Sequence, residues 1–306
     1  MAIIAIHNLS KWYGEVIGVS HVTCEIHPGV TGLLGPNGAG KTTFFKLISG
    51  LIRADTGSIA VDGQPVWNNP SIFQTIGYCP SIEKIYETMT GLEFLMYMAR
   101  LNGMSRSAAR ARALECLEQM DLSHAVNKSI GAYSKGMRQR VKFAQALIHD
   151  PEVLYFDEPL SGMDPIGRLK SVELIRRLGQ EGRTILVSSH ILEEVEDMTH
   201  QIMLLNNGML LAEGDVLEIR ELLEEQPRHV QIQTPDRRLL SNLLVQFPEV
   251  QTISFGDEPD LLIVMTTEAD SFYPRLNQIV LEKKIPIHEV VTLDDNLQSV
   301  FDYLVK

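Results

Sequence analysis

A glycine-rich segment ending in Lys-Thr-Thr has the residue types that bind phosphate groups. It consists of Gly35, Pro36, Asn37, Gly38, Ala39, Gly40, Lys41, Thr42 and Thr43. Glycines let the backbone curl so that several N–H groups point inward at phosphate oxygens, and a following helix adds its N-terminal N–H groups. In such loops the lysine reaches the β- and γ-phosphates of a nucleotide and the first threonine ligates Mg²⁺. An apolar run before this phosphate loop and a helical pattern after it argue against a chance match in a turn.

Two adjacent acids, Asp157 and Glu158, follow the apolar run from Val153 to Phe156. In proteins with a phosphate loop, an aspartate at a strand end holds Mg²⁺, usually through water. The next residue is placed where a carboxylate can orient the attacking water as a base. Alone, the pair also fits a solvated acidic strand end, but the phosphate loop favours the functional interpretation.

A third segment, from Tyr133 to Arg140, predicts a helix that begins after Ser134. Serine is a good N-cap, and Met137, Val141 and Ala144 fall on one helix face. The serine hydroxyl and the free N–H groups of the first turn would also form a second anion site. From spacing alone, ordinary helix capping is the stronger interpretation, and anion binding remains the alternative.

The elements around these motifs alternate between strand and helix patterns. The apolar runs 153–156 and 184–188 are separated by a helical pattern, which predicts a parallel sheet. Asn206-Asn207-Gly208 between two apolar runs predicts a β-hairpin. Short apolar runs at 3–6 and 19–26 predict a small N-terminal β-layer. We therefore expect an α/β nucleotide-binding domain over residues 1–218.

A helical subdomain is expected at about residues 88–150. Thr90 and Glu93 form a capping-box pattern that opens a helix ending near Leu101. A second helical pattern runs from Ser107 to Met120. Two consecutive helices that interrupt an α/β alternation indicate such a subdomain.

The last part of the chain predicts a separate small domain. A charged stretch at residues 219–227 is typical of a linker. Residues 228–306 then show the order β-α-β-β-α-β-α, with the final helix at 296–304, which predicts an α+β domain of the ferredoxin-like type. This segment has no phosphate loop and no paired catalytic carboxylates, so we expect an accessory or regulatory role.

Composition limits the class of protein. The 306 residues are enough for about two domains, and 44% hydrophobic with 22% charged residues is ordinary for a globular chain. A net charge of −12 disfavours a general nucleic-acid binder. No apolar run approaches the roughly 18–20 residues of a membrane span, and the N-terminus lacks a signal-peptide pattern. The three cysteines lack metal-ligand or redox spacing and are expected to be reduced thiols.

Taken together, the motifs and their order resemble the ATP-binding subunits of ABC (ATP-binding cassette) transporters. Tyr13 is similar to the aromatic residue that stacks on adenine, and residues 35–43 match the phosphate loop. Residues 133–137 match the signature motif, and 154–158 match the magnesium-binding strand with the catalytic glutamate. The resemblance covers residues 1 to about 218. It implies a P-loop NTPase cassette with a parallel sheet core.

The remaining family motifs are also present. Ser161 and Asp164 match the D-loop, and His190 matches the switch histidine, which elsewhere would be interpreted as a capping or partly buried histidine. The resemblance implies that Ser134, Lys135, Gly136 and Met137 complete the ATP site of the opposite subunit. The implied cofactors are ATP and Mg²⁺, with Thr42 and Asp157 holding the metal.

Several positions depart from the family pattern. Lys135 and Met137 replace the usual glycine and glutamine of the signature, whereas the family's phosphate-contacting Ser134 and Gly136 are retained. Ser81 stands at the Q-loop position, where glutamine is usual. A serine is shorter and has fewer hydrogen-bonding atoms, so we expect it to reach Mg²⁺ only through water and basal hydrolysis to be slow. The alternative is that Glu83 substitutes as a ligand.

The variant signature resembles the branch whose membrane subunits are separate proteins and which exports drugs, antibiotics, lipids or polysaccharides. The resemblance therefore implies an exporter ATPase at the inner face of the cell membrane, on the cytoplasmic side. Its partners would be integral-membrane subunits and a second copy of itself or a paralogous ATPase subunit, and not nucleic acid. One rival is an ABC ATPase acting on ribosomes or DNA, disfavoured by the single cassette and the missing coiled coils. A second rival is a nucleotide-binding regulator without hydrolysis, suggested only by Ser81 and Met137.

Overall fold

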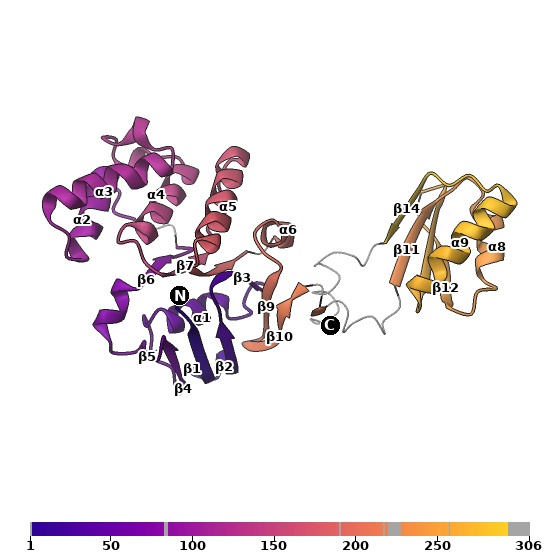
Figure 1. The fold of residues 1–306 in the computed structure, drawn as a ribbon, viewed down its shortest axis with the longest axis horizontal. Coiled ribbons are helices and arrows are strands. Elements are labelled where there is room, and N and C mark those ends of the chain that lie inside the picture. Colours follow the sequence, from indigo (N-terminus) through magenta and orange to yellow (C-terminus); the bar gives the residue numbers. More distant parts are fainter. Residues whose placement is uncertain are drawn as a thin grey trace. The chain divides into compact units, whose positions relative to one another are not determined.

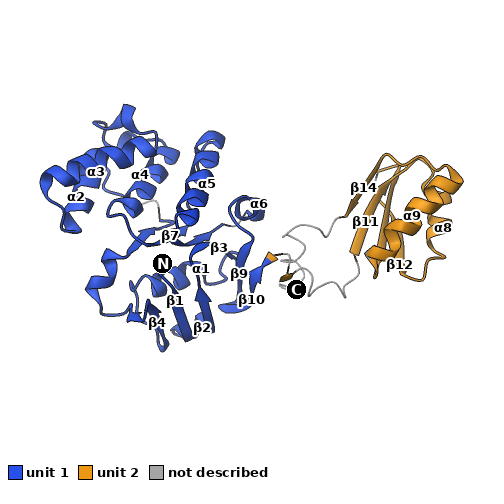
Figure 2. Ribbon diagram, in the orientation of Figure 1, with its two compact units in different colours: residues 1–215 blue, residues 216–306 orange. Residues whose placement is uncertain are grey.

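The computed structural model describes residues 2–82, 85–189, 191–216, 218–219, 228–256 and 258–292. The chain divides into two compact units, residues 1–215 and 216–306 (Figure 2). The sequence-based boundary was residue 218, and most of the expected linker, from residue 220 to 227, lies outside the described residues. Glu83, His190 and the helix expected at 296–304 also lie outside them.

A six-stranded sheet forms the centre of the first unit, in the order β10-β9-β3-β8-β7-β6 (Figure 1). Its strands are β3 (Gly29–Leu34), β6 (Ile76–Cys79), β7 (Val153–Asp157), β8 (Thr184–Ser188), β9 (Gln201–Asn206) and β10 (Met209–Asp215). β10 pairs antiparallel with β9 as the predicted hairpin, and the other neighbouring pairs are parallel. Because parallel strands end at the same edge of a sheet, the residues after β3, β6, β7 and β8 are brought together there.

A second, antiparallel sheet forms the N-terminal layer, in the order β2-β1-β4-β5. Its strands are β1 (Ile4–Tyr13), β2 (Val16–Ile26), β4 (Thr56–Val61) and β5 (Gln64–Pro65). The predicted layer is confirmed, but its first two strands are longer than the apolar runs from which they were predicted. Polar residues such as His7, Lys11 and His21 continue the strands because one face of this sheet is exposed.

Helices lie around the central sheet. They are α1 (Lys41–Ile48), α2 (Gly91–Leu101), α3 (Arg106–Gln119), α4 (Lys135–Leu147), α5 (Pro165–Gln180) and the short α6 (Leu192–Glu196), with 3-10 turns at Pro70–Gln74, Ser123–Ala125 and Ile130–Ala132. Three of them, α2 to α4, fall in the segment 88–150 where a helical subdomain was expected. The capping box of α2 is present as predicted: Glu93 N–H donates to Thr90 Oγ1 and Thr90 N–H donates to Glu93 Oε2.

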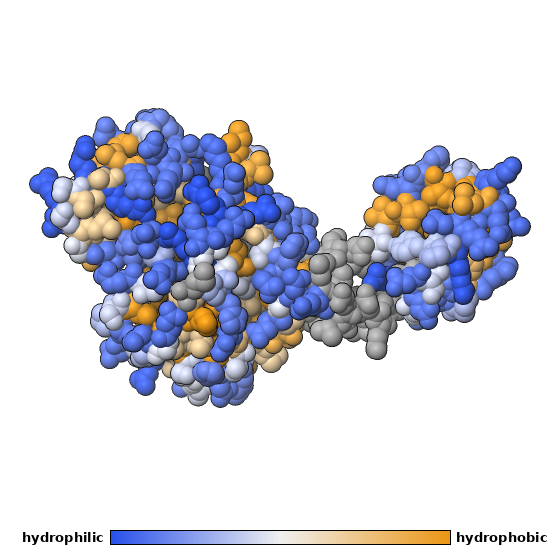
Figure 3. All heavy atoms as spheres, viewed as in Figure 1, coloured by the Kyte–Doolittle hydropathy of each residue, from blue (hydrophilic) through white to orange (hydrophobic). Residues whose placement is uncertain are grey.

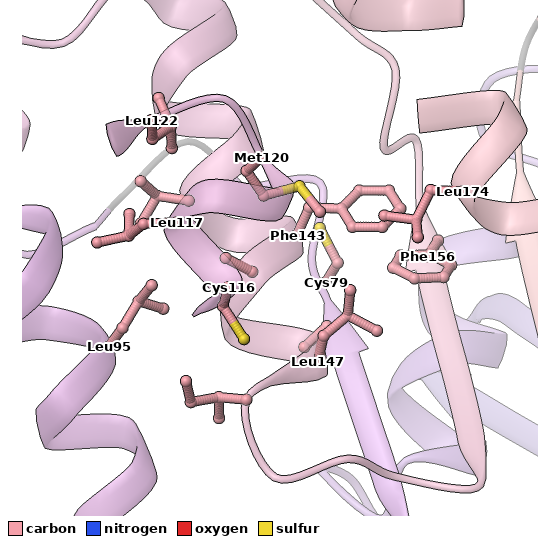
Figure 4. Packing of buried hydrophobic residues seen from close by; sticks show 14 of the residues in the cluster. Cys79, Leu95, Cys116, Leu117, Met120, Leu122, Phe143, Leu147, Phe156 and Leu174 are labelled. Carbon is pink, nitrogen blue, oxygen red and sulfur yellow. The ribbon is translucent and has the colours of Figure 1, made fainter. Parts of the chain in front are cut away.

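The helical subdomain is joined to the sheet by a continuous apolar core (Figure 4). Phe143 of α4 stacks on Phe156 of β7, with ring centroids 4.3 Å apart. Leu95, Cys116 and Leu117 bring α2 and α3 into the same cluster. Burying large side chains of this kind contributes about 1.5–3 kcal/mol each. This packing fixes α4 against the strand that carries Asp157.

The second unit has the ferredoxin-like topology. Its elements are β11 (Arg228–Gln233), α8 (Arg237–Leu244), β12 (Val250–Phe255), β13 (Leu261–Thr266), α9 (Ala269–Lys283) and β14 (Glu289–Thr292). The sheet order is β12-β13-β11-β14, with every neighbouring pair antiparallel. One face of the sheet is covered by a core that includes Leu240, Phe272 and Leu276 from the helices. The predicted β-α-β-β-α-β order is thus confirmed as far as residue 292.

Hydrophilic residues cover most of the face shown in Figure 3, with apolar residues in scattered patches. Within the described ranges, none of the helices has both the length and the apolar character that crossing a bilayer requires.

Each of the two apolar clusters described above draws its residues from one unit, which leads to a prediction about stability. A chain cut after residue 219 should still unfold cooperatively. Its melting temperature should differ from the matching transition of the full chain by no more than about 2–4 °C, the effect of roughly 1 kcal/mol in a domain of this size. Circular dichroism measures both transitions. A truncated chain without a cooperative transition would contradict the domain assignment.

Candidate functional site

The backbone of the phosphate loop depends on its glycines. Gly38 and Gly40 have φ angles of +84° and +104°, in the left-handed region that favours glycine. A Cβ atom on Gly40 would lie 2.2 Å from the carbonyl oxygen of Gly18, and one on Gly35 would lie 2.2 Å from that of Leu205. Larger residues at these positions would push the loop away from the strands that support it.

The loop is braced by the hairpin between β9 and β10. Gly208 N–H in the hairpin turn donates to Ala39 O at 2.9 Å, and Gly208 O accepts from Ser20 N–H at 2.7 Å. Asn37 and Gly38 are exposed at the tip of the loop, whereas Ala39 is buried beneath it. The loop is therefore held from one side and open on the other, as anion binding by its N–H groups requires.

Lys41 begins α1 and is buried under the loop. Its Nζ atom donates to Gly35 O at 2.6 Å and to Pro36 O at 3.1 Å. Burial lowers the pKa of the ammonium group, against the opposing effect of the nearby Glu158 and Asp157 carboxylates. Phosphate oxygens would be stronger, charge-assisted acceptors than these two carbonyls. The lysine is thus placed to receive a phosphate group inside the loop.

Three hydroxyl groups converge on the buried carboxylate of Asp157, which is 1% exposed. Its Oδ2 accepts from Thr42 Oγ1 at 3.0 Å and from Ser81 Oγ at 2.8 Å, and its Oδ1 accepts from Ser188 Oγ at 3.0 Å. The parallel register of β7 and β8 places Asp157 opposite Ser188. Thr42 and Asp157, the two residues expected to hold Mg²⁺, thus lie within hydrogen-bond distance of each other, and their oxygens belong to the ligand types that Mg²⁺ prefers.

Glu158 follows Asp157 in an uncommon backbone conformation, with φ of +49°. Its N–H donates to Ser188 Oγ at 3.0 Å, and its carbonyl oxygen accepts from Gln139 Nε2 at 3.4 Å. A residue with a side chain is held in this region only when its surroundings compensate the cost. These contacts place Glu158 beside the Asp157 carboxylate.

Tyr13 lies next to the phosphate loop and is 49% exposed. A Cβ atom on Gly18 would meet Thr43 Cγ2 at 2.9 Å and Tyr13 Cε2 at 3.0 Å, so the ring sits beside the start of α1. Lys11 Nζ lies 5.9 Å from the ring centroid and pairs with Asp55 at 3.0 Å. An exposed ring at this place suits stacking on a flat base.

The signature residues form the start of α4. Ser134 caps the helix by accepting from Met137 N–H at 3.2 Å, which confirms its predicted capping role. Ser134 and Lys135 are exposed and Gly136 is buried. A Cβ on Gly136 would approach Gly162 O at 3.3 Å, so the signature packs on the D-loop of the same chain. Anion binding by Ser134 stays a prediction.

The D-loop connects Glu158 to α5. Ser161 N–H donates to Glu158 O at 3.3 Å, and Asp164 caps α5 by accepting from Gly167 N–H at 3.2 Å. A cavity of about 100 Å³ beside Glu158 is also lined by Ser161, Arg168 and Glu194.

The residues on either side of His190, which itself lies outside the described residues, are held by hydrogen bonds and by an ion pair of Glu194. Glu194 is 8% exposed; its Oε2 accepts from Ser189 Oγ at 2.6 Å and its Oε1 lies 3.2 Å from Arg168 Nη1. Ser189 Oγ in turn accepts from Ile191 N–H at 3.0 Å. The predicted role of His190 stays untested.

The sequence reasoning missed three residues that contact this site: Ser188, Gln139 and Lys142. Ser188 ends the strand next to β7, so the parallel register was the signal that could have found it. Gln139 and Lys142 lie in α4 and contact loops far away in the sequence. No local pattern distinguishes them from other polar residues of a helix.

Comparison with known proteins identifies the family of this chain. The family described as "ABC transporter" matches residues 19–161. An uncharacterized ABC transporter ATP-binding protein of Nostoc sp. is 41% identical over 243 residues, covering 78% of this chain and 72% of that protein. The bacitracin transport ATP-binding protein BcrA of Bacillus licheniformis is 31% identical over 307 residues, covering 99% and 96%. The dimeric structure of MJ0796, a bacterial ABC transporter cassette, matches with a TM-score of 0.65 and 25% identity, over 70% of this chain and 98% of that one.

The chain therefore belongs to the ATP-binding proteins of ABC transporters. It is an ATP-binding and ATP-hydrolysing subunit, and the fold is that of the ABC cassette. The match to BcrA spans both units of the chain, whereas the matched family segment lies within the first.

Ser188 offers a test of how the two acids are held. Replacing Ser188 with alanine removes a donor to Asp157 and the acceptor of the Glu158 N–H, in a site where Ser188 is fully buried. Unsatisfied buried groups of this kind cost about 1–3 kcal/mol. We expect Ser188→Ala to lower the free energy of unfolding in urea by about that amount and to reduce ATP turnover.

Ser49→Ala is the matched control. Ser49 is also buried, but its hydroxyl donates to Phe45 O at the end of α1, away from Asp157. This variant should keep its ATP turnover. Equal loss of turnover in the two variants would contradict the role given to Ser188.

Proposed function

We propose that the chain hydrolyses ATP with Mg²⁺ at the edge of the sheet where β3 and β7 end. The hydrogen bond between Thr42 and Asp157 carries this proposal, because it joins the phosphate loop to a strand end 115 residues away. Lys41 and the loop N–H groups bind the β- and γ-phosphates, and the ring of Tyr13 stacks on adenine. Thr42 and Asp157 hold Mg²⁺, which neutralises charge on the phosphates. Glu158 takes the proton of the attacking water, and His190 contacts the γ-phosphate.

The active form is a dimer with ATP sandwiched between two cassettes. The exposed start of α4, with Ser134 and Lys135, supports this, because a capped helix start offers N–H groups to an anion from outside the chain. Gly136 and Met137 complete that half-site. The dimer of the similar cassette MJ0796 agrees with such an arrangement. The second cassette is another copy of this chain or a paralogous ATPase subunit.

The dimer drives separate integral-membrane subunits, and the transporter is an exporter acting from the cytoplasmic side of the cell membrane. The full-length similarity to the bacitracin transport protein BcrA supports this assignment. A groove of about 380 Å³ lies next to the loop that holds Ser81. Its lining includes Leu51, Phe73, Ile82 and Met98. Leu51, Phe73 and Ile82 are exposed, which suits a docking surface for a membrane subunit. The domain at residues 228–306 is an accessory domain with a regulatory role.

Replacing Glu158 with glutamine tests the chemistry. The amide keeps the shape of the side chain but cannot accept a proton, so turnover should fall by roughly 10²–10⁴-fold. Binding of a fluorescent ATP analogue should be retained. Lys41→Ala should instead weaken binding itself, because it removes the buried cation of the loop. Phosphate release and fluorescence anisotropy measure the two properties.

Glu152→Gln is the control, since this exposed acid precedes β7 at its other end. It should leave turnover unchanged. Near-normal turnover in Glu158→Gln would remove Glu158 from the role of base.

Assembly can be tested in the same background. Glu158→Gln should double in mass when ATP and Mg²⁺ are added, as measured by size exclusion with light scattering. Adding Ser134→Arg should prevent the doubling, because a bulky cation then occupies the exposed helix start. Ser105→Arg is the matched control: Ser105 caps α3 in the same way and is also exposed. A monomer that binds ATP at high protein concentration would argue against the sandwich.

A further inference from the structure

Lys142 is a lysine in an unusual environment. It lies in the middle of α4 and is only 3% exposed. Its Nζ atom donates to Pro80 O at 2.9 Å and to Ile82 O at 3.0 Å. Burying an ammonium group is costly unless such acceptors satisfy it, so the lysine holds this loop firmly. The function proposed above does not use it.

The two carbonyl oxygens that Lys142 binds lie on either side of Ser81. The Ser81 hydroxyl donates to Asp157 Oδ2, the same oxygen that accepts from Thr42. A serine side chain has one rotatable bond before its oxygen, so its reach is set almost entirely by its backbone. By fixing the backbone at residues 80 and 82, Lys142 fixes where the Ser81 hydroxyl points.

The same helix also contacts Glu158, the acid next to Asp157. Gln139, nearly one turn before Lys142, donates to Glu158 O at 3.4 Å. The signature residue Ser134 caps the start of this helix, about 12 Å along the axis from Lys142 at 1.5 Å per residue. The packing of Phe143 on Phe156 holds α4 against the strand that ends in Asp157. One rigid element therefore carries the signature at its start and contacts both the loop that holds Ser81 and the proposed base, Glu158, in its own subunit.

We propose that Lys142 is a positioning residue that sets Ser81 against Asp157 and so links the signature helix to the Mg²⁺ site of the same subunit. The inference rests on the proposed function, because it assigns Mg²⁺ to Asp157. When an opposing cassette engages Ser134, any shift of α4 is passed through Lys142 to the Ser81–Asp157 contact. The two ATP sites of a dimer are then connected through this lysine. The competing explanation is that Lys142 only anchors the helical subdomain and does not affect Ser81.

The test uses the full chain in the Glu158→Gln background, where turnover does not interfere. A fluorescent ATP analogue is bound at increasing Mg²⁺, and the Mg²⁺ concentration at half-maximal binding is measured. Lys142→Met should raise that concentration about 3–10-fold, the factor expected from the loss of one hydrogen bond to the buried carboxylate. Ser81→Ala should raise it by a similar factor. The double variant should be no worse than either single one, because the lysine acts through the serine.

Hydrogen exchange gives a readout that is independent of nucleotide. The amides of Cys79, Ser81 and Ile82 should exchange faster in Lys142→Met than in the parent protein. Arg140→Met is the matched control: Arg140 lies in the same helix and donates to Met120 O at 3.2 Å. It should leave both the Mg²⁺ requirement and the exchange of these amides unchanged.

Additive effects of Lys142→Met and Ser81→Ala, or an equal effect of Arg140→Met, would overturn the proposal. If Lys142→Met does not fold, Lys142→Gln keeps an N–H donor of shorter reach and is put through the same cycle. Failure of this inference differs from failure of the proposed function. In the first case Glu158→Gln still abolishes turnover, whereas in the second it does not.

Discussion

The carboxylate of Asp157 is the point on which the site depends. A buried ionised group is tolerated only when hydrogen bonds replace its lost water. Here three hydroxyls do so, from Thr42 at the start of α1, Ser81 after β6 and Ser188 at the end of β8. Each contact fixes a different segment of chain against the end of β7. The Asp157 side chain thus fixes the positions of the phosphate loop, the loop after β6 and the end of β8 relative to one another.

This arrangement changes the interpretation of Ser81. From the sequence, a serine at the Q-loop position was expected to reach Mg²⁺ through water. In the structure its hydroxyl donates to the aspartate itself, so it helps to hold the acid that would hold the metal. From the sequence, the short side chain of serine was expected to weaken its contact with Mg²⁺. In the structure it suits a donor placed next to the carboxylate.

Local signals in the sequence predicted local structure well. The capping box at Thr90, the glycine-rich loop and the hairpin at residues 206–208 depend on residues a few positions apart, and the structure confirms them. Prediction failed where tertiary contacts decide. β1 and β2 extend through polar residues because a neighbouring strand supplies their hydrogen bonds. The partners of Lys142 lie 62 and 60 positions away, and that of Ser188 lies 31 away, so sheet register and helix packing bring them together.

The two acids cannot move independently. Ser188 donates to the Asp157 carboxylate and accepts from the Glu158 N–H through one oxygen atom. Glu158 is held with positive φ, a conformation that costs on the order of 1–3 kcal/mol and must be compensated by such contacts. A shift of Asp157 therefore disturbs Glu158, because it disturbs the hydroxyl that both share. The hydrogen bonds that hold Asp157, the proposed metal ligand, therefore also set the position of Glu158, the proposed base. The groups that would stabilise phosphate charge and activate the water are in this way positioned together.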